Sequence, residues 1–362
     1  MAGAAPAQHL SSNRYPRQVP VPGLPESLLR RYRAVTLAQM QRCLEERHLP
    51  LYDIMRYHLG LADRRGGPSV GRGGKMLRPA LCLLCCEAVG GDYRKAAPAA
   101  AAVELLHNFT LIHDDIEDAS SSRHGRDTVW RVWGQPQAIN AGDGMYALAH
   151  LALGGLSEVR VPPDAALQAT RLLDGACLSL CEGQYLDLAF EERAEVSCDE
   201  YLQMVSGKTG ALLGAAAALG ALLGGASEEA VHAFDQFGQR LGLAFQVYDD
   251  LLGVWGNAEK MGKPAADILA RKKSFPVVFA LEQASESDRH ALRRAYARLS
   301  PSPADTERVV AVLERAGARQ AGQRAAVQFR DEALAALAGL TLVPARRRNL
   351  EALASYMVQR GY

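Results

Sequence analysis

The stretch of sequence that decides the fold runs from residue 97 to residue 118 and reads APAAAAVELLHNFTLIHDDIED. Alanine and leucine dominate its apolar positions, and both are strong helix formers, whereas the β-branched and aromatic residues that favour strands are sparse along the chain. The same helical periodicity recurs almost throughout, so the sequence predicts an all-α fold. The expected helices span residues 27–48, 77–89, 97–118, 137–153, 164–192, 199–223, 228–255, 275–282, 286–299, 304–316, 319–338 and 345–360.

No linker-like break divides this helical region, so we expect residues 26–362 to form a single domain, a bundle of about a dozen helices. Residues 1–25 contain five prolines and lack the basic and apolar segments of a secretory leader. We expect them to form a disordered arm, which is a candidate docking peptide for a partner. The uncharged run at residues 209–226 is short for a membrane span and contains several glycines, so it predicts a buried helix and no transmembrane segment.

Charge and cysteine content exclude several classes of function. The 362 residues include 41 basic and 40 acidic side chains, a formal net charge of +1. This balance provides no global field for nucleic acid or an anionic membrane, so local basic groups must hold any anionic ligand. The seven cysteines form no paired CxxC motif, and we expect buried thiols of a reduced, cytoplasmic protein rather than a metal or redox site.

The first candidate site is the acidic cluster DDIED at residues 114–118, at the end of an apolar helix. Asp114 and Asp118 lie one helical turn apart, so both carboxylates can reach one ligand, and His107 lies on the same face two turns earlier. Neighbouring carboxylates repel each other, and a divalent cation with a preference for oxygen ligands, such as Mg²⁺, removes that cost. A solvated helix end is the alternative for this motif taken alone.

A second acidic cluster, FQVYDD at residues 245–250, lies within another apolar helical run. Aspartates next to Phe, Val, Leu and Trp are poorly explained as surface residues, so the two clusters together favour the metal hypothesis. Lysine and arginine stand beside glycines in GGKMLRP (73–79), SGKTG (206–210) and GKP (262–264). Each basic motif alone is compatible with solvated charges, but in combination they indicate a site for a Mg²⁺-bound diphosphate.

Between residues 73 and 276 the motifs GGKMLRP, HNFTLIHDDIED, KTG, FQVYDD and GKP follow one another in an order and at spacings that resemble the trans-isoprenyl diphosphate synthase family. This family includes farnesyl and geranylgeranyl diphosphate synthases. The resemblance implies the isoprenoid synthase fold, in which a bundle of helices surrounds a deep central cavity, and a homodimer. It also implies head-to-tail condensation of isopentenyl diphosphate with an allylic diphosphate, dependent on two or three Mg²⁺ ions per active site.

The resemblance assigns roles to individual residues. The positions that match contacts to isopentenyl diphosphate are Lys75, Arg78, His107 and His124. Those that match contacts to the allylic diphosphate are Arg123, Lys208, Lys263 and Lys272, and Thr209 and Gln246 join Lys208 at the reaction centre. The metal positions are Asp114, Asp118 and Asp249, with Asp115 and Asp250 in support.

Three positions depart from the pattern of the family. His124 and Arg271 replace a usual arginine and a usual glycine, and Gly253 stands where the second cluster usually has a fifth carboxylate. A histidine is a conditional cation, so binding of isopentenyl diphosphate is expected to be looser or pH-dependent. A weakly active or non-catalytic subunit therefore remains an alternative.

Product length is expected to depend on Phe109, five residues before Asp114, and on the small Thr110 beside it. At 1.5 Å per residue Phe109 lies about 7 to 8 Å below the metal site. The resemblance to the family implies that an aromatic residue at this position stops chain growth at a C20 product, geranylgeranyl diphosphate. A role in core packing is the alternative. A class I terpene cyclase is a further alternative for the whole chain, although the NDxxSxxxE pattern that it needs is missing.

Overall fold

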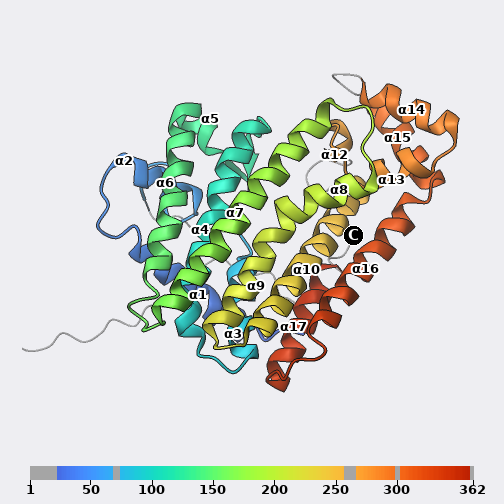
Figure 1. Cartoon of the computed structure of the whole chain (residues 1–362). Helices are drawn as coiled ribbons and strands as arrows, with labels where there is room; N and C mark the ends of the chain where they lie inside the picture. Colours follow the sequence, from blue (N-terminus) through green and yellow to red (C-terminus); the bar gives the residue numbers. More distant parts are fainter. Residues whose placement is uncertain (1–22, 68–73, 257–265, 298–301, 359–362) are drawn as a thin grey trace, which may run out of the picture.

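Helices account for nearly all the regular structure of the computed structural model, which describes residues 23–67, 74–256, 266–297 and 302–358 (Figure 1). One two-stranded antiparallel hairpin, β1 (Ser122–Arg123) and β2 (Arg126–Asp127), accompanies them. The all-α prediction is confirmed. The helical elements are α1 (Glu26–Arg42), α2 (Pro50–His58), α3 (Leu77–Ala88), α4 (Tyr93–Glu117), α5 (Val129–Trp133), α6 (Gln135–Gly154), α7 (Pro163–Glu192), α8 (Cys198–Val205), η1 (Ser206–Gly210), α9 (Ala211–Leu223), α10 (Glu228–Trp255), α12 (Ala266–Leu269), α13 (Phe275–Gln283), α14 (Glu286–Tyr296), α15 (Pro303–Arg315), α16 (Ala318–Ala336) and α17 (Pro344–Met357).

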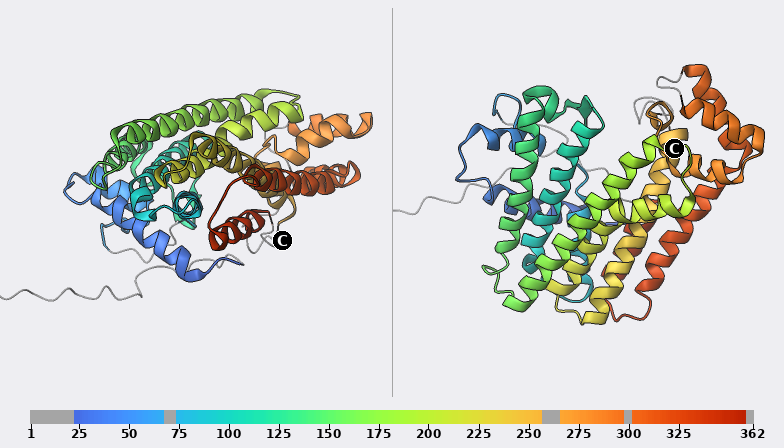
Figure 2. Two further views of the ribbon diagram at one scale, coloured as in Figure 1. Left: turned by 60° about the horizontal axis from the view of Figure 1, so that its bottom comes forward. Right: turned by 45° about the horizontal axis from the view of Figure 1, so that its top comes forward.

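The core is built on α4, α9 and α10, whose small side chains let neighbouring helices approach closely. The alanine-rich first half of α4 and nearly all of α9 are buried. A Cβ atom on Gly220 of α9 would lie 2.1 Å from the backbone oxygen of Cys82 in α3, so only glycine permits this crossing. Helix α10 packs against α9 and α16, and α6 packs against α4. Figure 2 shows α7 along one side of the bundle, with α1 and α17 on the opposite side.

The apolar segment Cys198–Leu223 is a core helix of this bundle. By length and composition it could cross a membrane, but 72% of its most apolar window is buried inside the protein. The prediction of a buried helix at residues 209–226 is therefore consistent with the structure. Four cysteines are buried as expected, whereas Cys181 is exposed because it lies on the outer face of α7.

The sequence pattern missed several short elements. Helix α2 and the five-residue α5 are too short for periodicity to reveal them, and each strand of the hairpin has only two residues. The helix expected at residues 199–223 is interrupted by η1, a single π-helical turn. Such turns occur mostly as single insertions within α-helices and are frequent at functional sites, and this one contains Lys208 and Thr209.

Candidate functional site

The carboxyl-terminal ends of α4, α7 and α10 lie at the same end of the bundle (Figure 1). The first acidic cluster is at the end of α4, where Asp114 is half-buried, Asp115 is buried and Asp118 is exposed. Burial raises the pKa of Asp114 to about 6; Lys208 opposes the rise, and repulsion by Asp118 and Glu117 adds to it. A carboxylate that is costly to charge in the free protein is well placed to gain from a bound cation.

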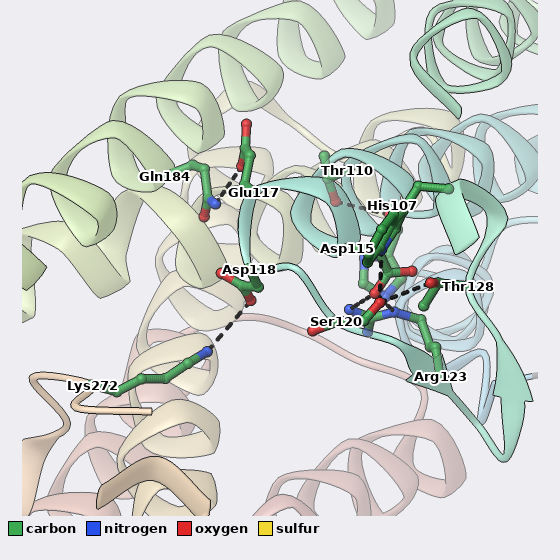
Figure 3. A network of polar contacts seen from close by, with 11 residues as sticks. His107, Thr110, Asp115, Glu117, Asp118, Ser120, Arg123, Thr128, Gln184 and Lys272 are labelled. Carbon is green, nitrogen blue, oxygen red and sulfur yellow. Dashed lines mark hydrogen bonds and ion pairs between the residues drawn. The ribbon is translucent and has the colours of Figure 1, made fainter. Parts of the chain in front are cut away.

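Lysine side chains already compensate part of this negative charge. Lys272, just before α13, places its Nζ atom 3.6 Å from Oδ2 of Asp118, as Figure 3 shows. Lys208 of η1 donates to the carboxylate of Asp187 on α7. Both lysines were assigned to the allylic diphosphate, and the structure places both beside carboxylates at this end of the bundle.

The second acidic cluster is tied into the protein by Asp250. Its carboxylate accepts hydrogen bonds from the Tyr201 hydroxyl at 2.6 Å, the Phe275 backbone N–H at 2.8 Å and the Gln246 amide at 2.9 Å. The amide oxygen of Gln246 in turn accepts from the Thr209 hydroxyl at 3.0 Å. A continuous polar chain thus links the π-helical turn to the start of α13.

Residues 272–275 connect the two acidic clusters. Phe275 donates its N–H to Asp250 of α10, and Lys272, three residues earlier, reaches Asp118 of α4. Asp249 is half-buried, and its side chain leaves α10 about 100° away from that of Asp250. The expectation that the clusters act together is therefore consistent with the structure, with Asp250 serving as an acceptor for three protein donors.

Helix α7 adds three polar residues that the sequence analysis missed. The Gln184 amide donates to Glu117 of α4 at 2.6 Å (Figure 3). Asp187 pairs with Lys208, and burial raises the pKa of Glu191, with repulsion by Asp118 adding to the effect. Their spacing of three and four residues, which places them on one helix face, was the signal that could have revealed them.

Close packing of α7 on η1 positions Lys208. A Cβ atom on Gly183 would lie 2.2 Å from the backbone nitrogen of Lys208, and one on Gly207 would lie 2.6 Å from the oxygen of Ser179. Both distances are too short for any residue that has a Cβ atom. Gly183 and Gly207 therefore allow α7 and η1 to cross in close contact next to Lys208.

A cavity of about 660 Å³ lies next to the first cluster and collects most of the cations assigned to isopentenyl diphosphate. Arg78 lies 3.1 Å from Nε2 of His107, and because an arginine can only donate, Nε2 accepts and the imidazole is neutral. Burial holds the pKa of His107 well below its usual value, and the charge of Arg78 lowers it further. The assigned residues that line the cavity are Lys75, Arg78, His107, Arg123, His124 and Asp115.

The hairpin carries two of these residues and is fastened at both strands. His124 and Gly125 occupy the two-residue turn with φ of +54° and +75°, as a type I′ turn requires. Arg123 donates from Nε to Asp115 at 2.8 Å, and Arg126 donates to the backbone oxygens of Tyr57 and Ala62 at 2.9 and 3.0 Å. The ion pair of Asp115 thus positions one wall of the cavity.

The remaining assigned residues have varied surroundings. The Phe109 ring faces α6, packing edge-on against Tyr146 with centroids 5.4 Å apart, and Thr110 is buried with its hydroxyl on the His107 carbonyl. Arg271 adopts the left-handed conformation, with φ of +57°, that the usual glycine would take without strain. Gly253 lies inside α10, and Lys263 lies outside the described residues.

The chemistry of these residues fits a divalent cation shared with a substrate. Within the described ranges no three His, Cys, Asp or Glu side chains converge closely enough to hold an ion by themselves. Oxygen ligands nevertheless predominate, and Oδ2 of Asp115 and Oε1 of Gln184 are buried with no hydrogen-bond partner among those residues. Mg²⁺ is usually held by one or two carboxylates together with substrate phosphates, a mode that this arrangement suits.

The family model for polyprenyl synthetase matches residues 68–313. The chain belongs to the polyprenyl synthetase family. Geranylgeranyl diphosphate synthase from Mycobacterium tuberculosis (strain ATCC 25618 / H37Rv) is 43% identical, and the match covers 87% of this chain and 89% of that protein. (2E,6E)-farnesyl diphosphate synthase from Mycobacterium bovis (strain ATCC BAA-935 / AF2122/97) is 37% identical, and the match covers 98% of this chain and 97% of that protein.

Solved structures agree with this membership. A polyprenyl synthetase from Streptomyces coelicolor A3(2) superposes with a TM-score of 0.85 at 38% identity, covering 92% of this chain and 99% of that one. A geranylgeranyl pyrophosphate synthase from Corynebacterium glutamicum, complexed with isoprenyl diphosphate and magnesium, has a TM-score of 0.78 at 26% identity, with 95% and 100% covered.

These matches confirm the isoprenoid synthase fold and identify a prenyltransferase that elongates prenyl chains. Such enzymes use isopentenyl diphosphate and an allylic diphosphate, and the family is in general Mg²⁺-dependent. The comparisons therefore favour chain elongation over the class I terpene cyclase and over a non-catalytic subunit.

Proposed function

We propose that this polyprenyl synthetase condenses isopentenyl diphosphate with an allylic diphosphate to give geranylgeranyl diphosphate, C20. The observation that carries the proposal is the cavity that gathers Lys75, Arg78 and His107 beside the acidic end of α4. Arginine and lysine in a pocket that excludes water bind the oxygens of a diphosphate strongly. The 43% identity with a geranylgeranyl diphosphate synthase supports the C20 product.

The allylic diphosphate binds, in this proposal, between the two acidic clusters. Asp114, Asp118 and Asp249 hold the Mg²⁺ ions, which when bound stabilise negative charge on the departing diphosphate. Lys208 and Lys272 add fixed positive charge, as do Arg123 and Lys263 by resemblance. Asp115 and Asp250 support the site from behind by holding Arg123 and Phe275.

The proposed reaction needs a dry cavity and one proton acceptor. The allylic C–O bond breaks and its electron pair leaves with the diphosphate. The alkene of isopentenyl diphosphate then supplies the electron pair of the new C–C bond, and a proton is lost to the departed diphosphate. Thr209 and Gln246, which are hydrogen-bonded to each other, line the reaction centre. There Lys208 holds the leaving group, and apolar walls exclude water from the allylic cation.

Phe109 and Thr110 set the product length in this proposal. The contact of the Phe109 ring with Tyr146 joins α4 to α6 at that level and gives the floor two aromatic residues. Phe109→Ala should lengthen the products beyond C20, measured by chromatography of the dephosphorylated prenols. Products of unchanged length would return Phe109 to core packing. If the unaltered enzyme made farnesyl diphosphate, its product would instead be that named for the farnesyl diphosphate synthase to which it is 37% identical.

We further propose that the enzyme is a homodimer that buries the outer faces of α6 and α7. Leu167, Leu178 and Tyr185 lie within about 20° of one another around α7 and are 52%, 63% and 72% exposed. A two-fold axis presents the same stripe from each copy, so the face is complementary to itself. On α6 the exposed apolar residues Ile139 and Tyr146 also lie within about 20° of each other around the helix.

Leu178→Asp should therefore give a monomer in size-exclusion chromatography with light scattering. Val327→Asp, which alters an equally apolar exposed residue on α16, should leave the dimer intact. A dimer in both variants would locate the interface elsewhere. For the rest of the chain we propose a cytoplasmic enzyme with one domain, residues 26–362, and a Pro-rich arm, residues 1–25, available to a partner. Residues 1–22 of the arm lie outside the described ranges.

The decisive experiment incubates the purified protein with labelled isopentenyl diphosphate, Mg²⁺ and each allylic diphosphate from C5 to C15. Elongated diphosphates that accumulate at C20 support the proposal. Cyclic hydrocarbons would support a cyclase, and recovery of unreacted substrates would indicate a non-catalytic subunit. Omission of Mg²⁺ should abolish turnover.

A further inference from the structure

The diphosphate cavity has a lining histidine that none of the sequence motifs contains. His58 is the last residue of α2, and it lines the cavity together with His107 of α4 and His124 of the hairpin turn. Three different elements therefore bring three imidazoles to one pocket, of which the sequence analysis identified two.

The groups that face His58 are mostly positive. Arg123, His124 and Arg126 act on it from the hairpin, and the Asn108 side chain of α4 hydrogen-bonds to it. His107 also faces it from α4, and Lys75 and Arg78 line the same cavity from the start of α3. Helix α6, which also packs on α2, presents Gly144 to Met55. Asp127 lines the same cavity.

The carboxylates of this cavity leave His58 with little negative charge. Asp115 is paired with Arg123, and Asp127 lies 3.8 Å from Arg131. The buried Glu104 lies close to Arg78 and receives a hydrogen bond from Asn108 at 3.4 Å. Burial lowers the pKa of His58 to about 3, and the positive charges of Arg123, His124 and Arg126 add to the effect. The imidazole is therefore neutral in the free protein at physiological pH.

A bound diphosphate reverses the field in this pocket. A diphosphate bound in this cavity would bring negative charge to the imidazoles that line it, and a nearby opposite charge favours the protonated form of histidine. The diphosphate itself is expected to lose a proton when it enters a cationic pocket, because its more highly charged form is favoured there. Net uptake of protons on binding therefore reports on the protein and not on the ligand.

We propose that His58 is a third imidazole of the isopentenyl diphosphate site, and that the site takes up protons from solvent onto its histidines as the diphosphate binds. This inference rests on the proposed function, since it takes isopentenyl diphosphate as the ligand. No covalent bond changes in the step. The histidines gain positive charge only when the anion is present, so the free cavity avoids the repulsion of a further positive charge beside its arginines.

Calorimetric titration of the full chain with isopentenyl diphosphate alone tests the proposal, since without an allylic partner nothing reacts. Titrations at pH 6.5, 7.0 and 7.5, each in two buffers of different ionisation enthalpy, give the number of protons taken up. We expect about one proton per site and a dissociation constant that rises about tenfold per pH unit. His58→Asn should lower the proton count and flatten the pH dependence, whereas His232→Asn, at an exposed position of α10, should change neither.

The outcomes separate this inference from the proposed function. Tight binding by the unaltered chain without proton uptake overturns the inference and leaves the function standing. No binding at any pH overturns both. Unchanged proton count and affinity in His58→Asn overturn the role of His58. The unaltered chain decides the proton uptake even if that variant fails to fold, and His58→Gln, checked by its melting temperature, then decides the residue.

Discussion

Two pairs of adjacent aspartates have the same sequence signature, Asp114-Asp115 near the end of α4 and Asp249-Asp250 near the end of α10. In each pair the first aspartate is half-buried and the second is buried. The partners of the buried member differ. Asp115 pairs with the charged Arg123, whereas Asp250 accepts from the neutral Tyr201, Gln246 and Phe275.

The two buried aspartates therefore position different cations. Asp115 fastens the hairpin, whose tip presents His124 to the diphosphate cavity. Asp250 fastens the start of α13 and with it the preceding segment, from which Lys272 reaches Asp118. The two members of each pair thus differ: the first is the proposed metal ligand, and the buried second is a support, for the hairpin in one pair and for the start of α13 in the other.

The largest effect is expected from the half-buried members. Asp114→Asn and Asp249→Asn should each lower kcat by about 10² to 10³-fold, because each removes a carboxylate that we propose binds the ions stabilising the leaving group. Steady-state assays over a range of Mg²⁺ concentrations measure this. Asp331→Asn, on the exposed side of α16, serves as the control. Full activity of either variant at equal Mg²⁺ would contradict the division of roles.

Asp115→Asn should mainly affect stability. It leaves Arg123 without its buried partner and should lower the free energy of unfolding by about 3 kcal/mol. KM should rise for both diphosphates, because the hairpin that Asp115 holds carries Arg123, assigned to the allylic diphosphate, and His124, assigned to isopentenyl diphosphate. Denaturant titration and steady-state kinetics give the two quantities. Asp53→Asn, which breaks an exposed ion pair with Arg56, should cost about 0.5 kcal/mol. Equal losses in the two variants would show that Asp115 is no special anchor.

Tyr201→Phe should have a smaller effect on the second support. It removes the Tyr201 hydroxyl as a donor to the Asp250 carboxylate, which should cost about 1 to 2 kcal/mol. KM for the allylic diphosphate should rise, while isopentenyl diphosphate is bound as before. Thermal unfolding and kinetics measure both, with Tyr93→Phe at the start of α4 as the control. A change confined to isopentenyl diphosphate would reverse the assignment of this support to the allylic site.

The smallest effect concerns the hairpin tip that Asp115 holds. Burial lowers the pKa of His124, with Arg123 adding to the effect, so the ring is neutral in the free protein. In the proposed site it gains its charge when a diphosphate binds. Apparent affinity for isopentenyl diphosphate should therefore fall as pH rises. The arginine of His124→Arg stays charged, so the fall in apparent affinity in this variant should be smaller by about threefold per pH unit. A profile identical to that of the unaltered chain would remove His124 from binding.

Sequence pattern was sufficient for the long helices and for the motifs that bear charge. Residues 97–118 predicted a helix that the structure extends to Tyr93–Glu117, since Asp92 caps it by accepting from the backbone of Arg94. Short elements such as α2 escaped because nine residues cannot establish a period. His58 escaped with them, because nothing in its neighbourhood marks a ligand until the hairpin is folded against it.

The sequence by itself determined the class of fold, the family and the set of charged residues available for a diphosphate and its cations, because local propensity and motif order are properties of the chain. Only the tertiary structure decided which aspartate of each pair is buried, which partner it holds, and that Lys272 joins α13 to α4. The physical reason is that burial and ion pairing depend on residues brought together from distant segments. The free energy of a charge is therefore set by its folded surroundings and not by its neighbours in sequence.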